Sequence, residues 1–402
     1  MGQPRTTGVP VRQMTAGLPH RPGRILLSIL SLQPGGAERV ISEMANWWAA
    51  RGLAVGVMTL GGGKNDHYEL APGVVRYRVD SWRHASSRLA RWADLALLPF
   101  AVRKTVRSFA PEVVVSFIDL VNNIMAFSLA GSGVPLVVCE RIDPRHHRIS
   151  KARALARRVL YPLACALVVQ TEAVAASWAR RVVPAHKVAV IPNFVRDLPP
   201  RSACPGPQGV SSPYVLAVGR LDAQKGHDLL IRAFAKVSRD IPGWRLVILG
   251  EGPERHTLSR LASSLGMSDS VMMPGVVPEP AAWMYGASLF VHPSRYEGFP
   301  NALLEAMAAG CAVIAADCPS GPAEIVRHGV NGVLVPSDDL ESLGTAMKTL
   351  MEDTKARERL GKEALKVAET FSSAAVMGAW DELLSRVTRK GDVQDGGPPW
   401  KR

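Results

Sequence analysis

Short apolar runs recur along the whole chain, and each is followed by a loop and then by a segment with helical periodicity. Runs of this length and composition predict buried strands. The predicted strands are Arg24–Ser31, Ala54–Leu60, Val113–Phe117, Pro135–Cys139, Leu167–Gln170, Val188–Ile191, Tyr214–Val218, Arg245–Gly250, Val271–Gly275, Leu289–His292 and Ala312–Ala316. The regular order of strand, loop and helix predicts parallel sheets of the α/β class, whose ligands bind where strand ends meet helix N-termini.

Helices are predicted where apolar residues return every three to four positions. The helix near Ala302–Ala309 is the best delimited, because Pro300 and Asn301 precede it and Gly310 follows at the position of a left-handed C-cap. The other predicted helices are Ala37–Gly52, one that begins at Ile118, Asp228–Arg239, Arg255–Leu265, the polar helices of Leu340–Thr370, and Phe371–Val387.

The chain has 402 residues, which is more than one core usually organises, so we expect two domains. The expected segments are a disordered basic arm at 1–22, a first domain at 23–196, a Pro/Ser/Gly-rich linker at 197–213, a second domain at 214–370, a final helix at 371–390 and a disordered tail at 391–402. Residues 1–22 lack the apolar core of a signal peptide, and the five cysteines show no C-x-x-C spacing. We therefore expect a cytoplasmic protein with reduced thiols.

The positive charge is concentrated in the first half of the chain. Of the overall +13, residues 1–200 contribute +14 and the remaining 202 residues contribute −1. Residues 81–108 and 145–158 are rich in Arg and Lys, and the first of these segments interleaves them with Trp, Leu and Phe. This composition is typical of helices that lie on an anionic membrane surface, although helices that merely cover the sheet are the alternative. Nucleic acid is not expected as a partner, because no nucleic-acid-binding motif accompanies the basic residues. With no apolar run of 18 residues, the protein is predicted to associate with the membrane peripherally.

Two carboxylates and two cations are the strongest candidates for chemistry. Glu297 and Glu305 flank the helix N-terminus at Asn301, where backbone N–H groups suit a phosphate. A carboxylate beside a phosphate is costly unless it accepts hydrogen bonds from hydroxyls, so a sugar nucleotide would use both features. Arg220 and Lys225 stand five residues apart in a glycine-edged loop and can hold one diphosphate between them. The alternative is that these are ordinary solvated charges.

Three segments resemble the retaining glycosyltransferases of family four, which have the GT-B fold. They are G-G-A-E-R after the first strand, G-R-L-D-A-Q-K-G after Val218, and E-G-F-P-N-A-L-L-E-A-M-A-A-G from Glu297. The resemblance implies two Rossmann-like, doubly wound domains that face each other across a cleft. It places the acceptor on residues 23–196 and the sugar nucleotide on 214–370, and it implies that helix 371–390 crosses back to the first domain.

The resemblance also assigns roles to individual residues. It implies catalytic roles for Glu297, Arg220 and Lys225. Donor contacts are implied for Gly35, Gly36, Arg220, Lys225, Glu297, Gly298, Phe299, Asn301 and Glu305. Acceptor contacts are implied for Ser116, Asp119, Asn122, Glu140 and Arg141. Many family members carry a His near Asp119, which this chain lacks, and we expect His146 and His147 to be solvated surface residues.

The segments G-G-A-E-R-V-I-S-E-M-A-N and C-E-R-I-D-P resemble bacterial enzymes that extend polyprenyl-diphosphate-linked oligosaccharides. The expected reaction is therefore transfer of a hexose or N-acetylhexosamine, with retention, from a nucleotide sugar, expected to be UDP-linked, to a lipid-linked or other membrane-held glycan acceptor. No metal or other cofactor is expected. The alternatives are the same chemistry on a soluble acceptor, and a non-catalytic protein that binds sugar nucleotides. A dinucleotide oxidoreductase is disfavoured, because the first strand is followed by only two glycines and not by G-x-G-x-x-G.

Overall fold

The computed structural model describes residues 22–61, 66–79, 88–147, 149–204, 206, 209–210 and 213–392, with side chains described for all of these except 88–96 and 390–392. Residues 1–21 of the predicted arm, residues 81–87 of the basic segment, Arg148, five positions of the predicted linker and residues 393–402 of the predicted tail lie outside the described residues.

The first sheet has seven parallel strands in the order β3-β2-β1-β4-β5-β6-β7. The strands are β1 (Arg24–Ile29), β2 (Ala54–Thr59), β3 (Val75–Arg78), β4 (Val113–Phe117), β5 (Leu136–Cys139), β6 (Ala166–Val169) and β7 (Val188–Val190). Successive side chains of a strand point to opposite faces. In β1, Ile25 and Leu27 therefore belong to one apolar cluster, whereas Leu26 belongs to another on the opposite face. Both faces of this sheet are thus buried, as all-parallel sheets require.

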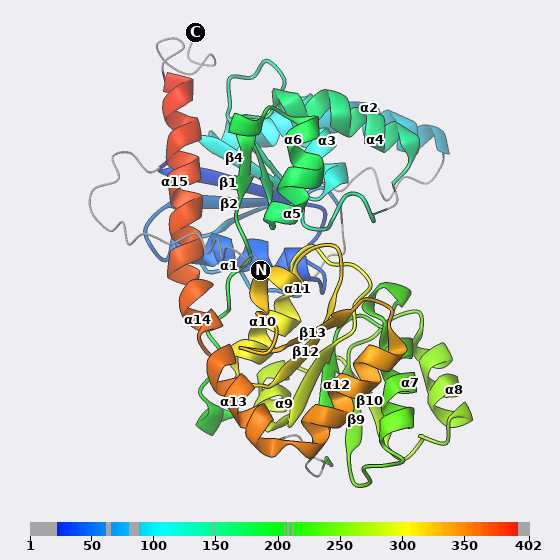
Figure 1. Cartoon of the computed structure of the whole chain (residues 1–402). Helices are drawn as coiled ribbons and strands as arrows, with labels where there is room; N and C mark the ends of the chain where they lie inside the picture. Colours follow the sequence, from blue (N-terminus) through cyan, green and yellow to red (C-terminus); the bar gives the residue numbers. More distant parts are fainter. Residues whose placement is uncertain are drawn as a thin grey trace, which may run out of the picture.

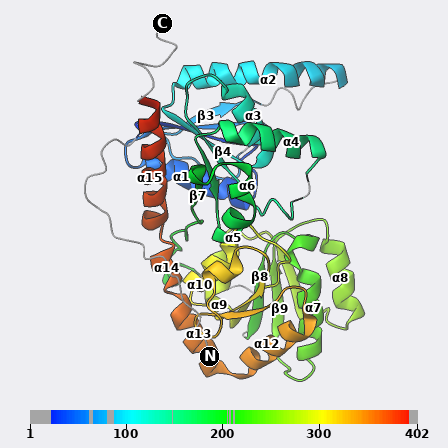
Figure 2. The ribbon, with the colours of Figure 1, turned by 45° about the horizontal axis from the view of Figure 1, so that its top comes forward.

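Helices cover the two faces of the first sheet (Figures 1 and 2). Helix α1 (Gly36–Ala49) packs on one face, whereas α2 (Arg88–Phe109), α3 (Asp119–Leu129) and α4 (Lys151–Leu160) lie side by side on the other. The shorter helical pieces are η2 (Tyr161–Leu163), α5 (Glu172–Val174), the π-helical turn η3 (Ala175–Ala179), α6 (Arg180–Val182) and η4 (Ala185–Lys187).

The second sheet has six parallel strands in the order β10-β9-β8-β11-β12-β13. They are β8 (Tyr214–Val218), β9 (Arg245–Leu249), β10 (Val271–Gly275), β11 (Leu289–His292), β12 (Val313–Asp317) and β13 (Val333–Pro336). The helical elements that accompany them are η5 (Arg201–Ala203), η6 (Ala223–Lys225), α7 (His227–Val237), α8 (Arg255–Ser264), α9 (Pro280–Gly286), α10 (Asn301–Ala308), α11 (Pro322–Ile325), α12 (Leu340–Glu352), α13 (Thr354–Ala364) and α14 (Val367–Thr370). The structure is therefore α/β with two doubly wound, Rossmann-like domains, and this confirms the predicted fold class.

Each sheet reverses its strand order at one place, between β1 and β4 in the first domain and between β8 and β11 in the second. Ligands of open α/β sheets bind outside the carboxyl ends of the strands at this switch point. The loops that follow β1 and β4 face those that follow β8 and β11 across the junction of the two domains (Figure 1). The fold thus brings two switch points together in one cleft.

Helix α15 (Ser373–Asp392) leaves the second domain and runs along the first (Figure 1). Its apolar residues belong to the same cluster as α1 and β1, and Trp380 stacks on Phe117 with ring centroids 6.5 Å apart. The indole of Trp48 in α1 donates a hydrogen bond of 2.9 Å to the buried Asp381 carboxylate. The chain therefore crosses between the domains twice, and its last helix completes the core of the first.

All of the strands predicted from the sequence are present, most of them within one residue at each end. The structure adds β3, β13 and α9. Strand β3 escapes the hydrophobic pattern because two of its four residues are arginines, and these pair with Asp66 at 2.9 Å. The helix expected at Ile118 begins one residue later, because Ile118 has φ of 75° and lies outside the helical region. Helix α15 continues two residues into the segment predicted as a tail.

Candidate active site

The loop after β8 carries the two predicted cations at one switch point. Its last residues form the short helix η6, and the Asp222 carboxylate accepts a hydrogen bond from the backbone N–H of Lys225 at 3.3 Å. A Cβ at Gly226, which has φ of +66°, would lie 2.2 Å from the carbonyl oxygen of Pro293, so only glycine lets the loop pack this closely on the end of β11. Arg220 pairs with Asp222 at 2.8 Å and stays largely exposed. The loop is thus rigid at its base and presents Arg220 to the cleft.

Glu297 is the buried charge at the centre of this arrangement. One of its carboxylate oxygens accepts a hydrogen bond from Lys225 Nζ at 2.6 Å and lies 3.0 Å from His292 Nε2. Burial raises the pKa of Glu297, but Lys225 and His292 lower it more, so the pKa lies well below its ordinary value. Ser320 Oγ donates a hydrogen bond of 2.6 Å to the Glu297 carbonyl oxygen. Glu297 is therefore an ionised hydrogen-bond acceptor at neutral pH, not a proton donor.

Two buried histidines lie beside this pair, and neither was predicted from the sequence as a site residue. His292 ends β11, and His227 begins α7 directly after the cation loop. Burial, together with the nearby Lys225 and His292, lowers the pKa of His227 to about 4, so this imidazole is neutral at pH 7. The only sequence signal was their position next to Gly226 and Pro293, at the two strand ends that carry the predicted site.

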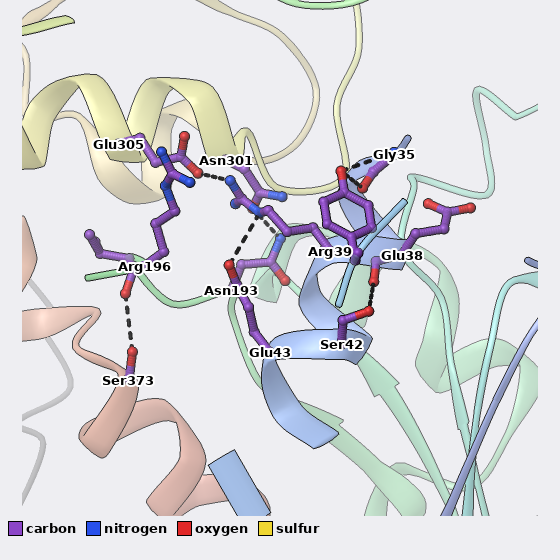
Figure 3. Close-up of polar contacts among 12 residues, drawn as sticks. Gly35, Glu38, Arg39, Ser42, Glu43, Asn193, Arg196, Asn301, Glu305 and Ser373 are labelled. Atoms are coloured by element: carbon purple, nitrogen blue, oxygen red, sulfur yellow. Dashed lines mark hydrogen bonds and ion pairs between the residues drawn. The ribbon is translucent and has the colours of Figure 1, made fainter. Parts of the chain in front are cut away.

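The N-termini of α1 and α10 face each other across the cleft (Figure 3). Gly36 begins α1, and a Cβ at this position would lie 3.2 Å from the side-chain nitrogen of Asn301, which begins α10. Asn301 is bonded in turn to Asn193 of the first domain at 2.5 Å. The first backbone N–H groups of a helix have no partner within the helix, and this end carries partial positive charge. The two ends therefore form a place for an anion between the domains.

The turn at Gly35 is closed by Tyr68, whose hydroxyl donates to the Gly35 carbonyl at 3.1 Å and accepts from its N–H at 3.3 Å. The Glu38 carboxylate folds over this turn (Figure 3). Burial raises the pKa of Glu38, while the positive charge of Arg220 opposes the rise. Glu38 and Arg220 therefore interact across the cleft, between the predicted glycine turn and the predicted cation loop.

Glu305 lies one turn inside α10 and forms an ion pair with Arg39 of α1 (Figure 3). The side chains of Glu305 and Arg39 are only 6% and 15% exposed, so the pair is largely withdrawn from water. The predicted donor residue Glu305 is thus occupied by a cation of the opposite domain. Arg39 belongs to the G-G-A-E-R segment that carries the resemblance, but no role was predicted for it.

Gly298 and Phe299, both predicted to contact the donor, have different positions. A Cβ at Gly298 would lie 2.4 Å from the carbonyl oxygen of Arg141, so the glycine permits close contact between the domains. The ring of Phe299 is instead in the core of the second domain, where it packs against Phe371 with centroids 5.6 Å apart. Only the backbone of Phe299 is therefore placed to meet a ligand.

Three residues predicted to meet the acceptor form one buried network in the first domain. Ser116 donates to the side chain of Asn122, which in turn donates to Tyr161 Oη at 3.0 Å, and Tyr161 donates to Glu140 at 2.6 Å. Burial raises the pKa of Glu140 to about 7, although Arg157 and the Tyr161 hydroxyl hold it down. Ser116 and Asn122 are completely buried, so they brace Glu140 and do not face the cleft.

The two other residues predicted to meet the acceptor, Asp119 and Arg141, follow the strands β4 and β5. Asp119 follows the strained Ile118, is 1% exposed, and accepts a hydrogen bond of 2.5 Å from Arg153. Arg141 donates to Asn193 at 2.7 Å, and burial lowers its pKa to about 10. Its guanidinium also lies over the Phe117 ring.

The two histidines expected to be solvated surface residues differ, because His146 is exposed as expected and His147 is not. His146 stacks on Tyr296 of the second domain, with ring centroids 6.0 Å apart. His147 is half-buried, and its Nδ1 is buried. Burial lowers the pKa of His147, although the negative charge of Asp119 opposes this. The loop after β5 therefore brings an imidazole close to Asp119, although the strand end at Asp119 itself carries none. In the part of the chain that the structure describes, no three His, Cys, Asp or Glu side chains are grouped to hold a metal ion.

The fold and this cleft define a glycosyltransferase of the GT-B architecture, and comparison with protein families agrees. A model described as "Glycosyl transferase 4-like domain" matches residues 35–193, and one described as "Glycosyl transferases group 1" matches residues 207–367. Together they account for most of the chain. The chain belongs to the glycosyltransferases of family four.

Several relatives of the chain have names that refer to bacterial glycans. An exopolysaccharide phosphotransferase of Streptomyces coelicolor is 38% identical over 210 residues, which are 52% of this chain and 22% of that protein. An N-acetylgalactosaminyltransferase of Campylobacter jejuni, named for a diphospho-undecaprenol substrate, is 36% identical over 40% of this chain and 44% of its own. The chain thus spans less than half the length of these two relatives. A second Campylobacter jejuni transferase, named for a PP-undecaprenol-linked GalNAc substrate, is 24% identical over 90% of this chain and 99% of its own.

Solved structures share the fold over nearly the whole chain. Sucrose-phosphate synthase from Thermosynechococcus elongatus aligns with a TM-score of 0.78 and 21% identity, over 91% of this chain and 99% of that one. The HepE protein of Anabaena, solved in complex with UDP and glucose, aligns with a TM-score of 0.75 and 22% identity, over 91% and 100%. At these identities the likeness concerns the fold alone.

Proposed function

We propose that the protein transfers a hexose or N-acetylhexosamine, with retention of configuration, from a UDP-linked sugar to a polyprenyl-diphosphate-linked or other membrane-held glycan. The observation that carries this proposal is the largely buried Lys225–Glu297 ion pair, which lies at one switch point, while the N-terminus of α1 lies at the other. The names of the Campylobacter jejuni relatives support the acceptor class, and the UDP bound to the Anabaena protein supports the donor class.

In the proposed complex the donor diphosphate lies between the N-termini of α1 and α10. Arg220 and Lys225 then supply two cations from one side, and Gly35 and Gly36 allow the chain to approach from the other. Glu305 accepts hydrogen bonds from the ribose hydroxyls. Glu297 accepts hydrogen bonds from the transferred sugar, because its contacts with Lys225 and His292 already fix the orientation of its carboxylate.

The chemistry in this proposal is charge stabilisation. As the bond between sugar and diphosphate breaks, negative charge grows on the leaving phosphate and positive charge on the sugar ring. Arg220, Lys225 and the two helix ends stabilise the first charge, and the ionised Glu297 stabilises the second. The departing phosphate accepts the proton of the acceptor hydroxyl as that oxygen bonds to the same face of the sugar. The charges supplied by the protein then suffice without a metal ion.

An exposed apolar strip on the first domain supports a membrane-held acceptor. Six of the ten large hydrophobic residues that are exposed in the described part of the chain lie on adjoining elements of one face. The apolar strip consists of Leu97 and Phe100 of α2, Phe127 of α3, Leu155 and Val159 of α4, and Leu163 of η2. Monomeric proteins rarely expose apolar surface of this kind without an interaction partner.

Cations accompany this strip, and exposed acids do not. The exposed residues of the same helices include Lys104 and Arg107 of α2 and Lys151 and Arg158 of α4. Among the residues of these elements whose side chains are described, the single acid is Asp119, which is buried. No helix within the described ranges has both the length and the apolar character to cross a bilayer. An apolar strip with a basic border fits an anionic lipid surface, which the protein would then contact peripherally.

Release of UDP or GDP from a panel of sugar nucleotides, with and without an extract of polyprenyl-diphosphate sugars, tests the transferase proposal. Nucleotide release that requires the extract supports a lipid-linked acceptor. The glycan product of that reaction then identifies the linkage that is formed. Full release with soluble sugars alone would instead favour a soluble acceptor. Binding of a sugar nucleotide without turnover under any condition would favour the non-catalytic alternative.

Co-sedimentation with anionic liposomes tests the membrane proposal separately. Leu97→Ser together with Phe100→Ser should reduce the bound fraction at least tenfold, because two exposed side chains would no longer enter the interface. The matched control is Leu365→Ser, which removes an exposed leucine of the second domain and should leave binding unchanged. Equal loss in both variants would show that the apolar strip has no special role.

A further inference from the structure

The guanidinium of Arg39 is held between two carboxylates. It is bonded to Glu305 of the opposite domain, and its Nε lies 3.7 Å from Glu43 Oε1, one turn further along α1 (Figure 3). Among the described residues, Arg39 Nη2 and Glu43 Oε2 are buried without a hydrogen-bond partner. Arg39 therefore binds one carboxylate directly, and the second carboxylate lies close by with an oxygen that has no hydrogen-bond partner.

The two carboxylates differ in what they join. The bond from Arg39 to Glu305 links the first domain to the second, whereas a bond to Glu43 would stay within α1. Glu305 is also the residue that the proposed function assigns to the ribose. A nucleotide and Arg39 thus compete for the same carboxylate.

We propose that Arg39 is a positioning residue that occupies Glu305 in the empty protein and moves to Glu43 when a nucleotide binds. This inference rests on the proposed donor site. Rotation of one side chain is enough for the exchange, since Glu43 is already within 4 Å of the guanidinium. The exchange converts a contact between the domains into a contact within one helix.

The exchange changes the affinity for the donor in a defined way. A ligand shifts an equilibrium only by its different affinity for the two states, so breaking the Arg39–Glu305 pair weakens binding. Glu43 offsets part of this cost, because it receives the displaced cation and a buried cation without a partner would be unfavourable. Arg39 therefore opposes nucleotide binding, and Glu43 favours it.

Titration of UDP and GDP into the full chain by calorimetry tests this with four variants. Arg39→Met should bind the nucleotide about fivefold or more tightly, because Glu305 is free from the start. Glu43→Gln should bind it about fivefold more weakly, because the displaced guanidinium has no second partner. In the double variant the Glu43→Gln change should have no further effect. Thermal unfolding checks that each variant is folded, and Arg39→Lys, which keeps the charge, should stay close to the wild type.

The opposite signs separate the proposal from its competitors. If Arg39 simply attracted the phosphates, Arg39→Met would weaken binding and Glu43→Gln would strengthen it, and this result would overturn the inference. Equal affinities in all variants would show that the pair is only structural. A wild-type chain that binds neither UDP nor GDP would overturn the proposed function itself, and the exchange with it.

Discussion

Replacement of Lys225 by Met is the most informative single change, because it removes the ammonium from a buried carboxylate and keeps the length of the side chain. Removing one partner of a buried ion pair typically costs ~3–5 kcal/mol. The Lys225 side chain is 19% exposed, and His292 stays 3.0 Å from Glu297, so water and the imidazole offset part of the loss. We therefore expect Lys225→Met to lower the free energy of unfolding by about 2–3 kcal/mol at pH 7.

The pH dependence of this effect has a definite sign. In the wild type the pKa of Glu297 is lowered, so its stabilisation is complete above the unfolded-state pKa of about 4.3 and is lost as the pH falls through the folded-state pKa. In Lys225→Met burial dominates, and the pKa of Glu297 should rise above its ordinary value. The folded state then binds the extra proton, so the free energy of unfolding should decrease as the pH rises from about 5 to 7.

Urea unfolding at several pH values measures both effects, and Glu297→Gln supplies the matched control. The double variant has no buried charge to leave unpaired, so Lys225→Met should cost little in that background. Transfer activity should be lost in all three variants. If Lys225→Met were as stable as the wild type and its free energy of unfolding did not change with pH, the proposal that Lys225 stabilises the buried Glu297 carboxylate would be refuted.

Three further changes test other contacts. Gly298→Ala would place a Cβ 2.4 Å from a carbonyl oxygen of the other domain. Small-angle scattering should therefore show a wider separation of the domains, and activity assays should show at least a tenfold loss of transfer. An unchanged scattering profile would contradict the contact. Tyr161→Phe removes a hydrogen bond to Glu140, whose pKa is about 7. Urea unfolding should show that the free energy of unfolding falls by about 1.5–3 kcal/mol at pH 8 and by less at pH 5, where the carboxyl is protonated. Equal losses at the two pH values would argue against this bond. Trp48→Phe leaves the buried Asp381 without the indole and should cost about 1–3 kcal/mol in thermal or urea unfolding, whereas the same change in an Asp381→Asn background should cost less.

Much of the fold was predictable because buried parallel strands are short, apolar and regularly spaced. The strand Val113–Phe117 was predicted residue for residue, since every one of its side chains is buried. Strand β3 was missed because its arginines are held by an aspartate that comes ten or more residues earlier in the chain. Such pairing depends on tertiary structure, which no local pattern contains.

The site was predicted in part for the same reason. Glu297 and Lys225 are 72 residues apart, yet each stands at the end of a strand beside a glycine or proline, and the resemblance connected them. The partners His292 and Arg39 have no such local signal, because a histidine at a strand end and an arginine in a helix are common. Glu140 stayed a prediction about the acceptor, since its buried network joins three separate elements. Contacts of this kind become visible only when the domains are folded and docked.

The position of α15 has a consequence for how the chain acquires its structure during synthesis. The core of the first domain includes Met377, Trp380 and Leu384, which are added after the whole second domain has been translated. Domains usually fold in the order in which the ribosome releases them. Here the face of the first sheet that α1 covers stays incomplete until α15 has been made, whereas the later domain contains all that its own core needs. We therefore expect the second half of the protein to become protease-resistant first on the ribosome, and a chaperone that shields apolar sheet surface to act mainly on the first.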